Sequence, residues 1–287
     1  MSVCASIYQP QFFPRLHYIN RVLDSDVFVI LASAQYTKTM THRLEDGSRE
    51  RRKTYQAHTP IKQHDGEYLI TLPVSSPGRL ATLEEMQPRV DRKWCTRYGN
   101  TLTAAYGRTP CFDARFPEAM ALLEGAKGGL AELNTSTLLW AIDVLLDLGV
   151  GIDRLSVDNV NDALAARRGG RLRRLVHDRD TGAARPEGAR MGGPWTAALC
   201  AAVGADEYLH GGTASAGYMD PTEYTARGIA LRQQHWEASS YPQAFTDRLG
   251  FLPNLSVLDL LFNVPPADAF PILYPSEATA GASRVDR

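Results

Sequence analysis

The stretch Ile7-Tyr8-Gln9-Pro10-Gln11-Phe12-Phe13-Pro14-Arg15-Leu16-His17-Tyr18 joins parts of the chain with different patterns. Before it lies a short apolar run, and after it come a helical pattern and a second apolar run at 27–31. Strand, loop, helix and strand in this order predict the start of a βαβ unit. The two prolines stiffen the loop, because each fixes its own φ and biases the preceding residue away from helix. Open α/β sheets bind ligands at such loops, although many of these loops bind nothing.

The composition is that of a globular protein without a strong overall charge. The chain has 287 residues, of which 44% are hydrophobic and 22% charged, so it can bury a substantial core. A formal net charge of -1 gives no field to attract DNA or an anionic membrane. No apolar run is long enough to span a bilayer, and we expect a cytoplasmic protein. The four cysteines are widely spaced, which favours buried free thiols over disulfides or a zinc site.

The order of the patterns predicts one α/β domain over residues 1–270. We expect a Rossmann-like three-layer core with a mainly parallel sheet and an added helical subdomain. Aromatic and aliphatic residues at helical spacing place that subdomain at about 90–150. From about 160 to 193 the composition shifts to Arg, Gly, Ala and Asp, which predicts a flexible insertion. The weakly patterned tail, 271–287, is expected to be poorly ordered.

Two polar segments are candidates for ligand contact. The charged stretch 37–53 is predicted to be a solvated hairpin or loop, and a basic lid over an anionic ligand is the alternative. The glycine-rich stretch 211–218 follows a predicted strand, 207–210, and its backbone N–H groups could approach a phosphate or carboxylate. It lacks the lysine of a Walker loop and the spacing of a dinucleotide fingerprint.

The last well-patterned stretch, 250–263, contains two polar residues with distinct expectations. Asn254 is a candidate N-cap for the apolar helix that follows it. Asp259 lies inside that apolar run, where a carboxylate needs partners. Tying two elements together and acting in catalysis are both open interpretations of Asp259.

Taken in order, these motifs resemble the WbqC-like protein family of bacterial glycan and natural-product assembly genes. The resemblance is carried most specifically by the opening loop, Gln9 to Tyr18, and by the block Phe251 to Asn263. Between them lie shorter matches: Asp26-Val27-Phe28-Val29, Gln35-Tyr36, Ile70 to Val74, Ala205 to Gly211 and Tyr241-Pro242-Gln243. The resemblance runs in order from about Ile7 to Asn263.

Several positions depart from the family pattern. Ala32-Ser33 stands where two acidic residues are usual, and His58-Thr59 replaces an Asn-Arg pair. A Lys-His pair is replaced around Arg97-Tyr98, and a His-Pro pair by Ala238-Ser239. The arginine-rich segment 167–193 is additional. These changes imply either a changed substrate or a site that binds without the relatives' chemistry.

The resemblance implies a small-molecule biosynthetic enzyme, and we expect an acyl- or aminoacyl-group transferase acting on an amine. The donor would be bound to CoA or to a carrier protein. Amides and phenols orient ligands and stabilise a developing oxyanion, while a histidine supplies a base near neutral pH. The catalytic candidates are His210, which is preferred, His58, His17 and Lys62. The substrate-binding candidates are Gln9, Tyr18, Gln35, Tyr36, Gly211, Gly212, Tyr218, Tyr241, Gln243, Asn254 and Asp259.

Two alternatives remain open at this level. The segment Phe13 to Tyr18 faintly resembles the histidine loop of nucleotidylyltransferase-like folds, in which phosphates bind at the helix N-terminus. A non-catalytic ligand-binding or partner subunit is the other alternative. No cluster of residues has metal-ligand spacing, and the cofactor is unknown. A homo-oligomer is an open alternative. Contact with RNA through the arginine-rich segment is a weaker alternative.

Overall fold

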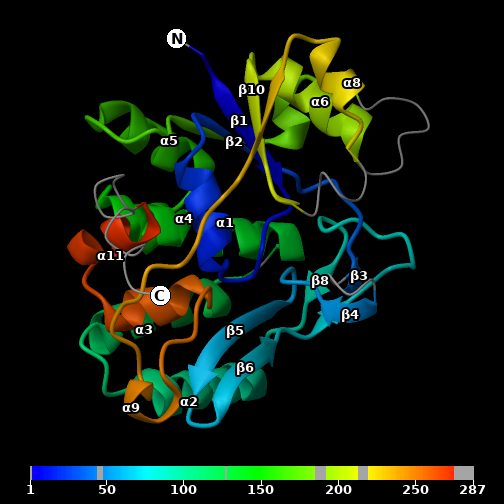
Figure 1. Ribbon diagram of the computed structural model, residues 1–287. Coiled ribbons are helices and arrows are strands. Elements are labelled where there is room, and N and C mark those ends of the chain that lie inside the picture. The colour runs from blue at the N-terminus through cyan, green and yellow to red at the C-terminus, as the bar shows by residue number, and fades with distance from the viewer. Residues whose placement is uncertain (1, 44–47, 127, 185–191, 213–218, 275–287) are drawn as a thin grey trace.

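The computed structural model of the chain describes residues 2–43, 48–126, 128–184, 192–212 and 219–274 (Figure 1). In the first half, the elements are β1 (Cys4–Tyr8), α1 (Leu16–Leu23), β2 (Val27–Ile30), β3 (Thr39–Arg43), β4 (Arg49–Lys53), β5 (His58–Gln63), β6 (Gly66–Thr71), β7 (Val74–Ser75), β8 (Gln87–Pro88), α2 (Arg92–Tyr106), α3 (Phe112–Glu124) and α4 (Leu130–Leu146). In the second half they are η1 (Ile152–Arg154), α5 (Val157–Ala166), β9 (Arg174–His177), η2 (Asp178–Thr181), α6 (Gly193–Ala202), β10 (Glu207–His210), α8 (Pro221–Thr225), β11 (Ala230–Gln233), α9 (Thr246–Leu249), α10 (Val257–Asn263) and α11 (Pro266–Leu273).

The central sheet is formed by strands that are far apart in the sequence. Within the described residues it has five strands in the order β11-β10-β1-β2-β9, and every neighbouring pair is parallel. The register pairs Ile7 with Val29 in the centre of the sheet. The opening stretch therefore forms the β1-α1-β2 unit that its pattern predicted, and the sheet confirms the predicted Rossmann-like α/β fold.

Helices cover both faces of this sheet, which gives three layers. Because side chains alternate along a strand, Ala5, Ile7 and Val29 pack in one apolar cluster with Trp195 of α6 and Tyr224 of α8. On the opposite face, alternate residues of β2 join α1 and α4 in a larger core; these are Phe28 and Ile30. Figure 1 shows α6 and α8 on one side of β1 and β10, and α1, α4 and α5 on the other.

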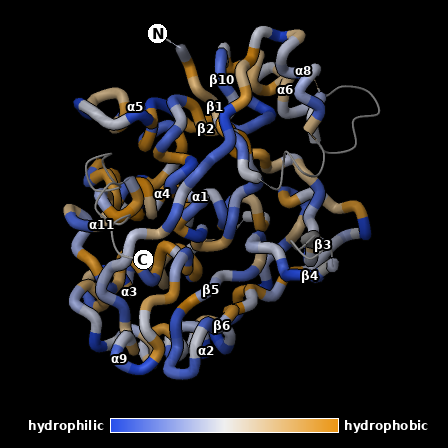
Figure 2. Tube along the Cα trace, in the orientation of Figure 1, coloured by the Kyte–Doolittle hydropathy of each residue, from blue (hydrophilic) through white to orange (hydrophobic). Residues whose placement is uncertain are grey.

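The remaining elements extend the core at one end. Helices α2, α3 and α4 occupy the predicted helical region, and their aromatic residues pack with those of the opening loop, as in the stacking of Phe13 on Tyr98. The β5–β6 hairpin packs beside α2 (Figure 1). Figure 2 shows hydrophobic colour along much of α4 and hydrophilic colour along the segment that follows β11 and crosses α1. That polar segment contributes to the site described below.

The structure corrects the expectation of a flexible insertion at about 160–193. Part of this range is regular structure, namely the end of α5, then β9 and η2. Strand β9 is an edge strand of the central sheet, and the arginine-rich composition hid it because only Leu175 and Val176 are apolar. Residues 185–191 lie outside the described residues. The tail prediction is also wrong at its start, since α11 continues to Leu273, while 275–287 lie outside the described residues.

Candidate functional site

The strand order creates a switch point between β1 and β10. From β1 the chain runs to β2 and β9 on one side, and later returns to form β10 and β11 on the other. The loops after β1 and β10 therefore leave the sheet side by side but in opposite directions, and open α/β sheets bind ligands at this place. The loop after β1 begins at Gln9 and the loop after β10 at Gly211. Both were predicted from sequence to contact substrate.

Arg21 of α1 lies at this switch point. Its side chain is buried, and its guanidinium carbon lies over the Tyr8 ring, 5.3 Å from the centroid. A Cβ atom at Gly211 would lie 2.5 Å from Arg21 Nη2, so a larger residue at that position would displace the guanidinium. Arg21 Nε and Nη2 both donate to Gln234 Oε1, at 2.9 and 2.7 Å. Arg21 thus joins the ends of β1, β10 and β11.

A second arginine, Arg15, lies at the start of α1. Its Nε donates to the carbonyl oxygen of Asn254 at 2.7 Å, and its Nη1 donates to the Tyr55 hydroxyl at 2.6 Å. Its guanidinium carbon lies 4.6 Å from the Tyr55 ring centroid. The partners of Arg15 are therefore neutral oxygens and an aromatic ring.

Asn254 connects the last motif block to α1. It adopts φ 57°, and its Oδ1 accepts hydrogen bonds from His17 N and from His17 Nδ1, both at 3.0 Å. The predicted N-cap role of Asn254 for its own helix is wrong, because α10 begins only at Val257 and is capped by Ser256. Asn254 instead satisfies the N-terminal turn of α1, where unpaired N–H groups need acceptors.

His17 and His210 lie close to Arg21 and have lowered pKa values. Burial, Arg21 and Arg15 lower the pKa of His17 to about 3 from an ordinary 6.5. Burial and Arg21 also lower the pKa of His210, whose Nδ1 lies 3.2 Å from the Gly211 carbonyl oxygen. A carbonyl oxygen only accepts, so in both residues Nδ1 carries the proton and Nε2 has a free lone pair. Both imidazoles are therefore neutral near pH 7, and a pKa of about 3 makes His17 a weak base.

His58 has a similar hydrogen bond but a deeper position. Its Nδ1 lies 2.8 Å from the Thr54 carbonyl oxygen, and its Nε2 is buried without a hydrogen-bond partner in the described part of the chain. Burial lowers the pKa of His58, and the side chain is only 1% exposed. A substrate would need a rearrangement to reach it, so His58 is the weakest base candidate of the three.

The amide and phenol candidates of the opening motifs form a link between loops. Gln9 Oε1 accepts from Gln56 Nε2 at 2.5 Å, and Gln9 Nε2 lies 3.4 Å from the Gln35 carbonyl oxygen. Tyr36 is partly buried beside them, and burial raises its pKa. Tyr18 is buried edge-on between Tyr8 and Phe28, which is the environment of a core residue. Gln9, Gln35 and Tyr36 therefore shape the rim of the switch point.

Four other candidates form a separate buried network. Asp259 Oδ1 accepts from the Tyr241 hydroxyl at 2.7 Å and from Gln243 Nε2 at 2.8 Å, and Asp259 Oδ2 accepts from the Tyr106 hydroxyl at 2.8 Å. Lys62 Nζ donates to the Gly250 carbonyl at 2.6 Å and to Gln243 Oε1 at 3.2 Å. Burial lowers the pKa of Lys62 and raises that of Asp259. The network ties β5, α2 and α10 to the 241–250 segment, so its polar groups are occupied by one another.

Two of the substrate-binding candidates, Gly212 and Tyr218, belong to the glycine-rich stretch 211–218. Gly212 lies next to Gln233, whose Nε2 would be 3.4 Å from a Cβ at position 212. Tyr218 lies outside the described residues.

Arg15 and Arg21 were not predicted, although Arg15 stands within the opening motif. A signal for Arg21 exists in the sequence, since it lies four residues after His17 and hence on the same helix face.

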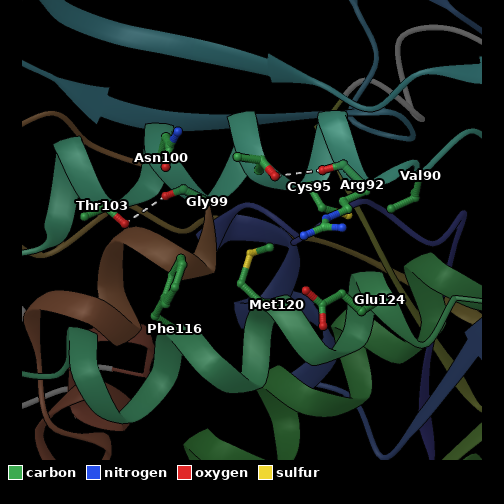
Figure 3. A pocket seen from close by; sticks show the side chains of 10 residues that line it. Val90, Arg92, Cys95, Gly99, Asn100, Thr103, Phe116, Met120 and Glu124 are labelled. Atoms are coloured by element: carbon green, nitrogen blue, oxygen red, sulfur yellow. Dashed lines mark hydrogen bonds between the residues drawn. The ribbon is translucent and has the colours of Figure 1, made fainter.

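Pockets elsewhere in the molecule do not contain the predicted residues. A pocket of about 770 Å³ lies between α2 and α3, with Arg92, Glu124 and Met120 in its lining (Figure 3). Another, of about 470 Å³, lies between α4, the start of α5 and His177 at the end of β9. Among the described residues, no group of three or more His, Cys, Asp or Glu side chains is placed to hold a metal ion. In the same residues, no helix is long and apolar enough to cross a membrane.

The fold and its switch point define an α/β protein of Rossmann-like architecture in which the loops after β1 and β10 meet at the carboxyl ends of the parallel strands. A model of the WbqC-like protein family matches residues 9–269. This range covers most of the chain, which therefore belongs to the WbqC-like protein family, as the motif resemblance indicated. No curated protein and no solved structure gave a match.

Proposed function

We propose that this protein is a small-molecule group transferase that moves an acyl or aminoacyl group onto an amine of a glycan or natural-product intermediate. The observation that carries the proposal is the pair of neutral imidazoles, His17 and His210, at the switch point beside Arg21. A neutral histidine with a free Nε2 can accept a proton from an attacking amine, and this role falls to His210 because a pKa of about 3 makes His17 a weak base.

In the proposed reaction, the amine nitrogen attacks the carbonyl carbon of a thioester donor on CoA or a carrier protein. The carbon–nitrogen bond forms, the carbon–sulfur bond breaks, and the amine proton passes to an imidazole and then to the leaving thiolate. His210 is the preferred base because it borders the loop that follows β10. Positioning and oxyanion stabilisation would supply most of the rate enhancement, because the donor is already activated.

The test compares His210→Gln with a matched surface variant, His64→Gln. His64 is exposed in the turn between β5 and β6, far in sequence from the switch-point loops. With acyl-CoA or acyl-carrier donors and an amine acceptor, we expect His210→Gln to lower kcat by about 10² to 10⁴, the usual contribution of a general base. His64→Gln should leave turnover unchanged. Equal turnover in both variants would remove His210 from the mechanism.

A non-catalytic ligand-binding or partner subunit is the second candidate. It is favoured by the Asp259 network, because four motif residues there bond to one another and not to open space. Co-purification of a partner protein at equal stoichiometry, with no response to any donor, would support this candidate over the transferase.

The nucleotidylyltransferase-like alternative finds less support. It needs free N–H groups at the start of α1 to bind phosphates. Leu16 N donates to the Leu255 carbonyl oxygen at 3.0 Å, and His17 N donates to Asn254 Oδ1. The segment 254–255 therefore already fills the position that a phosphate would take.

A further inference from the structure

We infer that Arg21, together with Arg15, forms an oxyanion-binding site at the switch point, which takes a phosphate or carboxylate group of the substrate. This inference rests on the proposed function only in assigning that anion to a substrate. The binding site itself is argued from the partners, burial and surroundings of the two guanidinium groups.

The first argument is the absence of a counter-ion. Within the part of the chain that the structure describes, no carboxylate lies within 4 Å of Arg15 or Arg21. Arginine has five N–H donors, and the hydrogen bonds of Arg21 to Gln234 use only Nε and one N–H of Nη2. Donors therefore remain for an anionic ligand.

The second argument is burial. The side chain of Arg21 is only 6% exposed, and removing a charged group from water is costly unless an opposite charge compensates it. A cation held in such a place without a carboxylate is suited to an anion that arrives with the substrate. Arginine also matches the planar geometry of phosphate and carboxylate oxygens.

The third argument is that Gln234 holds Arg21 in place without neutralising it. Gln234 Nε2 donates to the His17 carbonyl at 2.8 Å and to Asn20 Oδ1 at 2.5 Å, which fixes its amide. Its Oε1 then faces Arg21. A glutamate at this position would present a negative charge in the same place, so the neutral amide keeps the positive charge of Arg21 available.

The surroundings place the bound anion next to the proposed bases. Arg21 lies close enough to His17 and to His210 to lower the pKa of each. The missing side chain at Gly211 leaves the end of β10 open toward the guanidinium. An anionic substrate group on Arg21 would therefore fix the distance between the rest of the substrate and the two imidazoles.

The test measures anion binding without turnover. Thermal unfolding of the full chain is followed at constant ionic strength with inorganic phosphate and, separately, with acetate. Binding to the native state raises Tm as ligand is added. We expect a saturable rise with at least one anion, and the anion that gives it identifies the phosphate or carboxylate class.

Two variants and one control locate the site. Gln234→Glu and Arg21→Gln should each weaken binding by roughly tenfold or more, the scale expected for one close charge. Arg227→Gln removes an arginine paired with Glu223 on the surface and should keep the wild-type response. An unchanged response in Arg21→Gln, or no response of the wild-type chain to either anion, would overturn the inference.

A measurement on the wild-type chain covers the case in which the variants do not fold. Phenylglyoxal modification followed by mass spectrometry should show that the binding anion protects Arg15, which is more exposed than Arg21, but not Arg227. Equal modification with and without the anion would also overturn the inference. A Tm response without any transferase activity would reject the proposed function and keep the anion site, so the two failures are distinguishable.

Discussion

Arginines have opposite surroundings at the two ends of the parallel strands, called here the amino edge and the carboxyl edge of the central sheet. At the amino edge, Arg232 contacts Asp24 and Glu207, each at 2.7 Å, and Arg171 lies within 3.6 Å of Asp24, Asp26 and Glu207. At the carboxyl edge, Arg15 and Arg21 contact a phenol, a carbonyl, an amide and aromatic rings.

The arginines at the amino edge have a structural role, whereas those at the carboxyl edge carry a charge that remains available to a ligand. At the amino edge each guanidinium shares carboxylates that hold the starts of β2 and β10, where hydrogen-bonded ion pairs satisfy one another. Arg171 of the arginine-rich segment belongs to this ion-pair cluster. At the carboxyl edge the charges are positioned but not neutralised, as a binding site requires.

The largest effect on stability is expected in the buried network around Asp259, because both oxygens of this carboxylate are hydrogen-bonded. Asp259→Ala would leave the Tyr106 and Tyr241 hydroxyls and the Gln243 amide without their acceptor. We expect a loss of about 3–5 kcal/mol in the free energy of unfolding, measured by urea denaturation. Asp259→Asn, which keeps an acceptor, should cost less. A loss below about 1 kcal/mol in Asp259→Ala would contradict the assignment of this network as structural.

The next largest effect compares the two edges directly. Asp24→Ala removes a carboxylate shared by Arg171 and Arg232, and we expect it to cost about 2 kcal/mol because both guanidiniums are only partly exposed. Arg21→Met removes a charge that has no carboxylate partner, and we expect it to cost about 1 kcal/mol or less. Denaturant midpoints of the two variants test this order. An equal or larger cost for Arg21→Met would break the comparison between the edges.

A smaller effect is expected from acid. The pKa of His17 is lowered, so the unfolded chain takes up a proton near pH 6.5 that the folded protein does not. The stability due to neutral His17 is therefore complete above about pH 6.5 and declines toward the folded pKa of about 3. At the amino edge, burial raises the pKa of Glu207, but the hydrogen bonds from Arg232 and Cys4 and the charges of Arg232 and Arg171 together lower it, so its contribution is lost only below the ordinary 4.5.

Denaturation between pH 7 and 5 isolates the carboxyl-edge contribution. We expect the wild-type chain to lose at most about 1.4 kcal/mol per pH unit for each neutral histidine, and less for partly exposed His17. His17→Gln should flatten the profile in this window and leave the decline below pH 4.5 unchanged. An identical slope in the two proteins would show that folding does not lower the pKa of His17.

The sequence predicted which loops adjoin the switch point better than the roles of individual residues. Gln9, Gln35, His210 and Gly211 do lie around the switch point, because parallel strands bring their carboxyl ends to one edge. Lys62, Tyr241 and Gln243 were grouped with them as motif residues, whereas the position of Asp259 in an apolar run had left a structural role open. The fold places these four in a separate network, which no local pattern could indicate because their partners are far apart in the chain.

By itself, the sequence determined the βαβ start, the α/β class and the family, because these depend on local periodicity and on motifs in order. Tertiary structure decided which charges are neutralised. Arg21 and Arg232 are the same residue type. Gln233 follows Arg232 in the sequence, and Gln234 contacts Arg21 in space. Only the fold brings carboxylates to Arg232 and a neutral amide to Arg21, since Coulomb energy depends on distance in space and not on position along the chain.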